Sequence, residues 1–232
     1  MTAVIFAGCT GSLSTLDPAG PAASSIATMW WFMLAGATLL LVLVAGLLLL
    51  AFVSPGVGTG PSPQAFVLTG GLALPGLTLA ALVVYALIVG EHLLPHPVSS
   101  DGVRLRVIGQ RWHWAFEYDH PAGARRSIGV LHVPAGRLVE VQVTSTDVIH
   151  SFWVPRLAGK IDAIPGHITA LRLKADAPGT YRGVCGEFCG VGHAGMDFTV
   201  QAHPEPEYLD AIDRLADALP HSLPPHTAQR AP

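Results

Sequence analysis

Hydrophobic residues follow different patterns in the two halves of the chain. Residues 29–53 form an almost uninterrupted apolar run, and a second run covers residues 66–89 after a connector rich in Gly and Pro, SPGVGTGPSPQ. An α-helix needs about 20 residues to cross the hydrocarbon of a membrane, so each run predicts a spanning helix. Pro75 and the glycines of the second run are tolerated in such helices. We therefore predict a transmembrane helix hairpin over residues 29–97.

Beyond Pro97 the pattern is that of short β-strands. Apolar and β-branched residues alternate with polar ones, and turn sequences such as HPAGAR, VPAGR and DAPGT separate the runs. This spacing predicts a small all-β sandwich or barrel over residues 98–203. The expected strands are residues 103–107, 112–118, 127–133, 138–144, 168–173 and 198–202.

The two ends of the chain carry weaker signals. In residues 204–232, Leu209, Ile212, Leu215 and Leu219 recur at helical intervals, and a tail rich in Pro and polar residues follows, which predicts a short helix and a flexible end.

Residues 1–28 begin with MTAVIFAGC, a short apolar run with small residues before Cys9. A lipoprotein signal remnant with a lipidated Cys9 and an incidental cysteine both fit this run, which has no basic residue at its start.

Composition supports a membrane protein. The chain is 50% hydrophobic and 12% charged, whereas soluble proteins average about a quarter charged residues. No Asp, Glu, Lys or Arg lies between Asp17 and Glu91. The small formal net charge of −3 argues against a nucleic-acid partner. Three cysteines are too few for a disulfide scaffold.

The segment CGEFCGVGHAGM carries the candidate chemistry. It presents two thiols, Cys185 and Cys189, the imidazole of His193 and the thioether of Met196. This soft donor set favours copper, because structural zinc sites use Cys and His. A blue-copper site needs one Cys, two His and an axial Met, and the distant histidine here would be His150. The additional thiol favours two copper ions bridged by two thiolates.

Each donor also has an ordinary explanation. The C-x3-C pair is compatible with a disulfide or half of a zinc site. Met196 could pack in the core, and His150 could be a hydrogen-bonded interior histidine. The joint occurrence of these donors behind two predicted membrane spans favours copper.

Three segments resemble subunit II of the haem–copper oxidases, of the cytochrome c oxidase type with a CuA centre. They are GQRWHWAFEY at residues 109–118, DVIHSFWVPRLAGKIDAIPGH at 147–167 and GTYRGVCGEFCGVGHAGMDFTV at 179–200. With the helix hairpin, the resemblance extends from about residue 28 to 202. It implies the fold of a two-helix transmembrane hairpin followed by an all-β cupredoxin-like sandwich or barrel.

The resemblance also implies a ligand set for two copper ions. The two cysteines of the motif would bridge the ions. One copper would be completed by His150 and Met196, and the other by His193 and the backbone carbonyl of Glu187.

Further roles follow from the same resemblance. The side chain of Glu187 would face the catalytic subunit and help to hold a magnesium ion, which suits a carboxylate donor. Trp112 matches the position where electrons enter from cytochrome c, with core packing as the alternative for Trp112 and for Trp114. Many members carry an acidic residue early in the second helix where this chain has Leu68, which puts proton entry through this subunit in doubt.

The implied function is electron transfer in a respiratory terminal oxidase, from cytochrome c through CuA to haem in subunit I, where oxygen is reduced to water. The implied partners are the catalytic haem–copper subunit I, other oxidase subunits, cytochrome c and membrane lipid. The implied location is a bacterial inner membrane, with the β-domain on the periplasmic side. Alternatives are a copper-free quinol oxidase subunit II, a CuA-bearing nitric oxide reductase subunit and a copper chaperone or storage lipoprotein.

Overall fold

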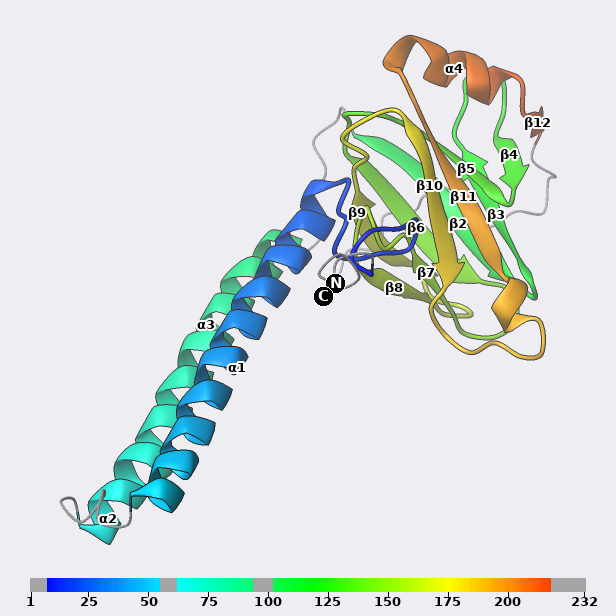
Figure 1. The fold of residues 1–232 in the computed structure, drawn as a ribbon. Helices are drawn as coiled ribbons and strands as arrows, with labels where there is room; N and C mark the ends of the chain where they lie inside the picture. The colour runs from blue at the N-terminus through cyan, green and yellow to red at the C-terminus, as the bar shows by residue number, and fades with distance from the viewer. Residues whose placement is uncertain (1–7, 55–61, 94–101, 218–232) are drawn as a thin grey trace. The chain divides into compact units, whose positions relative to one another are not determined.

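The computed structural model describes residues 8–54, 62–93 and 102–217. The predicted C-terminal tail with Leu219, and the run before Gly8, lie outside these ranges. The chain forms two compact units, one of residues 25–94 and one that combines residues 1–24 with residues 95–232. Figure 1 shows a pair of long helices and a β-sandwich as the bodies of these units.

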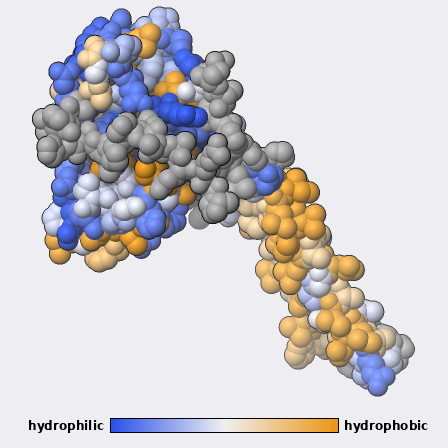
Figure 2. All heavy atoms as spheres, turned by 180° about the vertical axis from the view of Figure 1, so that it is seen from behind, coloured by the Kyte–Doolittle hydropathy of each residue, from blue (hydrophilic) through white to orange (hydrophobic). Residues whose placement is uncertain are grey.

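Two apolar helices form the helical unit. α1 spans Pro21–Val53, and the second helix comprises α2 (Pro63–Phe66), the π-helical turn η1 (Val67–Ala73) and α3 (Leu74–Leu93). Ser62 caps the second helix, because its Oγ accepts the N–H of Ala65 at 3.2 Å and Pro63 follows it. Apolar stretches of 33 and 29 residues are long enough to cross a membrane. Figure 2 shows the hydrophobic surface that they expose.

The β-domain packs two sheets face to face. Their strands are β2 (Val103–Gln110), β3 (His113–Tyr118), β4 (Arg125–Ile128), β5 (Val130–Pro134), β6 (Val139–Ser145), β7 (His150–Trp153), β8 (Lys160–Ala163), β9 (Thr169–Leu173), β10 (Gly179–Cys185), β11 (Asp197–His203) and β12 (Ala216–Asp217). The strand orders are β12-β4-β3-β2-β6-β9 and β5-β11-β10-β7-β8. The β2–β6 and β5–β11 pairs are parallel, and the remaining pairs are antiparallel. The predicted two-helix and β-sandwich architecture is confirmed.

Aromatic side chains join the two sheets. Trp114 on β3 contacts Phe152 on β7 and Phe198 on β11, with ring centroids 5.8 and 5.7 Å apart, and Phe152 and Phe198 stack at 4.9 Å. A Cβ atom at Gly183, on the neighbouring β10, would lie 2.1 Å from the Phe198 ring. The core therefore depends on a glycine that leaves room for an aromatic ring.

The sequence pattern merged two strands into one, and it predicted the C-terminal helix but not its buried face. The predicted strand at residues 127–133 is two strands, β4 and β5, because Gly129 between them has a positive φ of 73°. Helix α4 (Glu205–Asp213) turns Tyr208 and Ile212 inward and leaves Leu209 63% exposed. Leu215 follows the helix rather than extending it. β7, β8, β10 and β12 were also not predicted. β7, β8 and β12 have four residues or fewer, which is too short for a clear alternation.

The N-terminal segment before α1 packs on the β-domain. Arg156 forms an ion pair with Asp17 at 3.1 Å and donates through Nε to the Asp17 carbonyl. The Ala19 N–H donates to the Arg156 carbonyl at 2.7 Å. A Cβ atom at Gly20 would lie 2.2 Å from the Lys174 carbonyl oxygen. Residues 17–20 are thus part of the β-domain unit, which the sequence pattern did not indicate.

Two histidines meet where α4 covers the edge of the second sheet. His132 Nδ1 on β5 and His203 Nε2 on β11 lie 2.8 Å apart. Burial lowers the pKa of both side chains, and the neighbouring His203 lowers the pKa of His132 further. The charge of Glu207 acts in the opposite direction on His203 without reversing the shift. Both imidazoles are therefore neutral at neutral pH.

This pair predicts a pH dependence of stability. Since the folded pKa values lie below the ordinary 6.5, the unfolded chain binds more protons as the pH falls past 6.5, and the free energy of unfolding decreases. Urea unfolding of the metal-free chain at pH values on both sides of 6.5 measures this dependence. A variant with His132→Asn and His203→Gln should show a flatter pH profile, and an unchanged profile would contradict the assignment.

Candidate metal centre

The two thiols and His150 meet at one end of the β-sandwich. Cys185 is the last residue of β10 and His150 is the first of β7, and these strands pair side by side. Cys185 Sγ lies 3.9 Å from His150 Nδ1 and 3.9 Å from Cys189 Sγ. The ligand atoms of His150, Cys185 and Cys189 all lie within 4.8 Å of one another. This is the arrangement of a group that can hold a metal ion.

The other three predicted donors lie around the same thiols. His193 Nδ1 and Met196 Sδ are each 3.7 Å from Cys189 Sγ. The Cys185 thiol points to the backbone carbonyl of Glu187, with Sγ and O 3.2 Å apart. The structure therefore brings together all six residues that the sequence singled out as donors, although His150 is 35 positions before Cys185.

Backbone hydrogen bonds hold the loop that carries these donors. The Cys185 N–H donates to the Met196 carbonyl at 3.0 Å, and the His193 N–H donates to the Gly190 carbonyl at 3.1 Å. Gly190 has a φ of 120°, which disfavours a residue with a side chain. The chain then continues through the short helix η2 (His193–Gly195) into β11. Met196 is only 1% exposed as a result.

Asp147 fixes the orientation of His150. The imidazole Nε2 is 2.8 Å from Asp147 Oδ1, which turns Nδ1 toward Cys185. Burial alone would raise the pKa of Asp147, but hydrogen bonds from the Arg111 peptide, His150, the Val148 peptide and the Arg111 side chain outweigh it and hold the pKa well below its usual range. Asp147 is therefore an anionic partner for a metal-binding imidazole. Sequence reasoning missed it, although it lies three positions before His150.

A glycine on β2 makes room for this histidine. A Cβ atom at Gly109 would lie 2.9 Å from His150 Cδ2 and 3.2 Å from the Trp114 ring. The imidazole and the indole pack edge to face with centroids 5.9 Å apart, and both side chains are fully buried. Trp114 is thus a core residue that supports the candidate ligand His150.

The chemistry of the donor set fits copper. Cys185 and Cys189 are free thiols, and their 3.9 Å separation is far from the S–S bond length of about 2.05 Å. Burial and, to a smaller extent, the nearby Cys185 thiol raise the pKa of Cys189 to about 11. Binding of a metal ion must displace these protons. Two thiolates, two imidazoles and a thioether are soft donors that suit copper.

The two tryptophans of the aromatic motif differ in exposure. Trp112 is 41% exposed. Its indole lies against the donor loop, because a Cβ atom at Gly192 would come within 2.4 Å of Trp112 Cδ2 and one at Gly190 within 3.4 Å of Cζ2. Trp112 thus connects the surface to the loop between Cys189 and His193. Core packing applies to Trp114 and not to Trp112.

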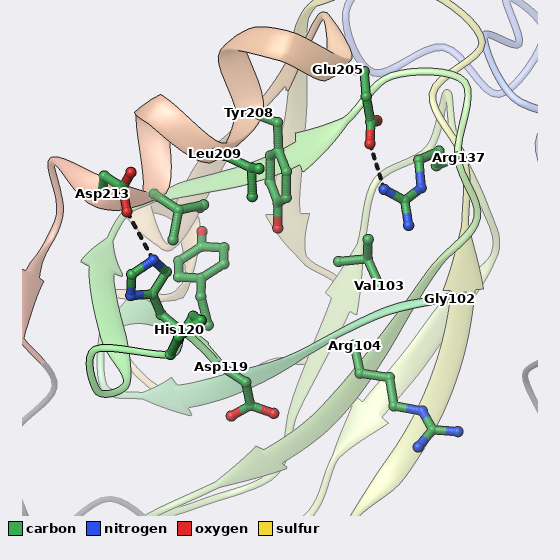
Figure 3. Close-up of a pocket in the computed structure, with 13 residues that line it drawn as sticks. Gly102, Val103, Arg104, Asp119, His120, Arg137, Glu205, Tyr208, Leu209 and Asp213 are labelled. Carbon is green, nitrogen blue, oxygen red and sulfur yellow. Dashed lines mark hydrogen bonds and ion pairs between the residues drawn. The ribbon is translucent and has the colours of Figure 1, made fainter. Parts of the chain in front are cut away.

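A cavity of about 600 Å³ lies beneath α4 (Figure 3). Two pairs of polar side chains meet among its lining residues: His120 Nε2 is 2.8 Å from Asp213, and Arg137 donates to Glu205 at 2.5 Å. None of the predicted metal ligands lines it. The cavity is therefore separate from the thiol centre.

Comparison with known proteins finds a similarity in the segment that holds the candidate donors. Residues 125–203 match the family model of the cytochrome c oxidase subunit II periplasmic domain. This range includes the candidate donors Cys185, Cys189, His150, His193 and Met196. The segment that holds the candidate donors is therefore similar to this periplasmic domain. The predicted resemblance to cytochrome c oxidase subunit II is thereby confirmed.

The chain is similar to subunit 2 proteins from several organisms. Cytochrome c oxidase subunit 2 of Alkalihalophilus pseudofirmus is 39% identical over 115 residues, which cover 49% of this chain and 33% of the relative. Heme-copper oxidase subunit 2 of Aeropyrum pernix is 33% identical over 150 residues, 64% of each chain. The match thus spans less than two thirds of each relative. The solved periplasmic domain of subunit II of cytochrome oxidase of Bradyrhizobium japonicum is 28% identical, with a TM-score of 0.48, over 51% of this chain and 95% of that domain.

Proposed function

We propose that the chain is the electron-transfer subunit of a respiratory haem–copper terminal oxidase. It takes electrons from cytochrome c at a binuclear CuA centre and passes them to haem in the catalytic subunit, where oxygen is reduced to water. The observation that carries this proposal is the contact of two thiols with two imidazoles, a thioether and a carbonyl oxygen. A mononuclear blue-copper site would leave one of these thiols without a role, and a copper-free quinol oxidase subunit would need none of them.

The ligands divide into two shared and four separate donors. Cys185 and Cys189 would bridge the two copper ions. His150 and Met196 would complete one copper, and His193 with the Glu187 carbonyl would complete the other. When bound, the copper pair supplies a site that stores and releases single electrons.

The surrounding residues keep the ligand geometry nearly constant. His150 is fully buried and Met196 is 1% exposed, so water is excluded from this side of the centre. Asp147 holds the His150 ring at 2.8 Å, and the aromatic core supports the ring from behind. Ligands that move little between oxidation states lower the cost of each electron transfer, and neighbouring hydrogen bonds tune the metal.

Trp112 is the proposed point of electron entry. Its exposed indole is accessible to a docking cytochrome c, and its inner face rests on the donor loop at Gly192. One electron at a time would pass from the reduced haem of the cytochrome to the thiolate centre across this short contact.

Replacement of Gly192 by Val should slow this electron entry, because any Cβ displaces the indole. We expect the rate of cytochrome c oxidation by the assembled oxidase to fall toward that of a Trp112→Ala variant. Copper content and the CuA spectrum should stay unchanged in both, as measured by metal analysis and stopped-flow absorbance. A Gly195→Ala variant is the matched control, since a Cβ there meets open space. Wild-type oxidation rates for Gly192→Val would contradict the positioning of Trp112.

Other features support an assembled membrane complex. The exposed side chain of Glu187 is available for a magnesium ion shared with the catalytic subunit, and a carboxylate suits this hard cation. The two apolar helices would anchor the chain in a bacterial inner membrane, with the β-domain in the periplasm. Leu68 in η1 offers no acidic group for proton entry. Cys9, which is partly exposed and has a free thiol, would carry a lipid if the preceding run is a signal remnant.

The test is the electron paramagnetic resonance spectrum and copper content of the copper-loaded full chain in detergent. Two copper ions per chain and a hyperfine pattern from one electron shared by two equivalent copper nuclei would support the proposal. One copper per chain with a blue-copper spectrum, or no copper, would overturn it.

A further inference from the structure

A second group of metal-binding side chains lies at the opposite end of β11 from the thiol centre. Met196 directly precedes β11, and His203 is its last residue. Figure 1 shows β11 running from the donor loop to α4. An extended chain rises about 3.3 Å per residue, so His203 lies roughly 20 Å from Met196. A ligand at His203 is therefore distinct from the copper centre.

Strand register brings His132 and His203 to the same face of the sheet. β5 and β11 run parallel, with His132 opposite Gln201. His203 is two residues beyond Gln201 and so points to the same side. Leu131, Val133 and Ala202 alternate with these positions along the two strands and point into the core. The two imidazoles thus project outward together, with ring planes 18° apart and centroids 5.1 Å apart.

The nitrogen atoms that face each other have the spacing of a metal chelate. His132 Nδ1 and His203 Nε2 are 2.8 Å apart. Two nitrogens bound to one tetrahedral zinc ion at about 2.0–2.1 Å are roughly 3.3 Å apart, so small side-chain rotations would admit an ion. The imidazole that donates the present hydrogen bond would have to move its proton to its other ring nitrogen. Zinc binding then needs no net release of protons.

The surroundings leave access for an ion and for water ligands. Both imidazoles are partly exposed. Glu207, in the first turn of α4, is exposed and close enough for its charge to act on His203. α4 packs against both β5 and β11. Neutral imidazoles are donors typical of zinc sites, and the nearby negative charge favours a cation.

We propose that His132 and His203 form a second metal site, which binds a divalent transition-metal ion such as zinc with water molecules as the remaining ligands. The ion would link the edge strand β5 to β11 beside α4. Binding to the folded chain alone would raise its unfolding temperature. This proposal does not depend on the proposed electron transfer.

Zinc titration of the copper-loaded full chain in detergent tests the site. Copper binds such ligands more tightly than zinc, so copper is limited to two equivalents per chain, which the thiolate centre takes up first and then does not exchange for zinc. We expect wild type to retain one more zinc ion per chain than His132→Gln or His203→Gln, by mass spectrometric metal analysis after desalting. His167→Gln, at an exposed histidine, should retain as much zinc as wild type. Circular dichroism melting curves without zinc verify that each variant is folded.

A second measurement needs no variant. Diethylpyrocarbonate modifies accessible imidazoles, and peptide mass mapping reports the modified positions. Saturating zinc should protect His132 and His203 in wild type and leave His167 reactive. The proposal is wrong if the folded histidine variants retain as much zinc as wild type, or if zinc leaves His132 and His203 as reactive as His167.

Discussion

Replacement of Cys189 by Ser is expected to abolish the proposed binuclear copper centre. Cys189 Sγ is in contact with Cys185 Sγ at 3.9 Å and with His193 and Met196 at 3.7 Å. A serine hydroxyl is a hard and weakly acidic group that cannot replace a bridging thiolate. We expect copper per chain to fall from two to at most one, and the mixed-valence signal to disappear.

The matched control is Cys9→Ser, which removes the cysteine that lies outside the proposed centre. Because Cys9 lies in the N-terminal segment, this variant should keep two copper ions and the wild-type spectrum. Metal analysis and electron paramagnetic resonance of the two variants, prepared side by side, provide the comparison. A Cys189→Ser variant that keeps both copper ions would refute the bridging role of this thiol.

Replacement of Phe198 by Ala should cause the largest loss of stability. The Phe198 ring is 3% exposed and contacts Trp114 and Phe116 of the opposite sheet and Phe152 on β7 of its own sheet. Truncation of a buried aromatic side chain leaves a cavity and costs about 3–5 kcal/mol. Because Phe198 lies two residues after Met196, the loss should also loosen the ligand loop. Chemical denaturation followed by tryptophan fluorescence measures the change in the free energy of unfolding.

Phe188→Ala is the control for this prediction. Phe188 has the same type of side chain but is 76% exposed. Its truncation should therefore change the free energy of unfolding by no more than about 0.5 kcal/mol. Equal destabilisation by the two substitutions would show that the aromatic cluster does not hold the sheets together.

The sequence predicted those parts of the protein that depend on local composition. Two apolar runs are sufficient to indicate two spanning helices, because the membrane requires length and hydrophobicity rather than particular partners. The alternation at residues 138–144 indicated β6 (Val139–Ser145), since a strand with one buried face repeats every two residues. The order of Cys, His and Met in one short loop likewise identified the candidate metal donors.

Local structure departed from the pattern where a single residue or a tertiary contact decided it. Gly129 interrupts one predicted strand through its positive φ. Tyr208 rather than Leu209 faces the β-domain, because the sheet edge beneath α4 selects which side of the helix is covered. Asp17 and Gly20 belong to the β-domain through contacts with Arg156 and Lys174, which are far away in the sequence.

The sequence by itself determined the two long apolar helices, the β-rich class of the second unit and the identity of the candidate metal donors. Only the tertiary structure decided that Asp147 orients His150, that Trp112 rests on Gly192, and that His132 meets His203 across 71 positions. The physical reason is that hydrophobicity and donor chemistry belong to each residue. A distance between side chains instead depends on strand register and on which sheet each strand joins.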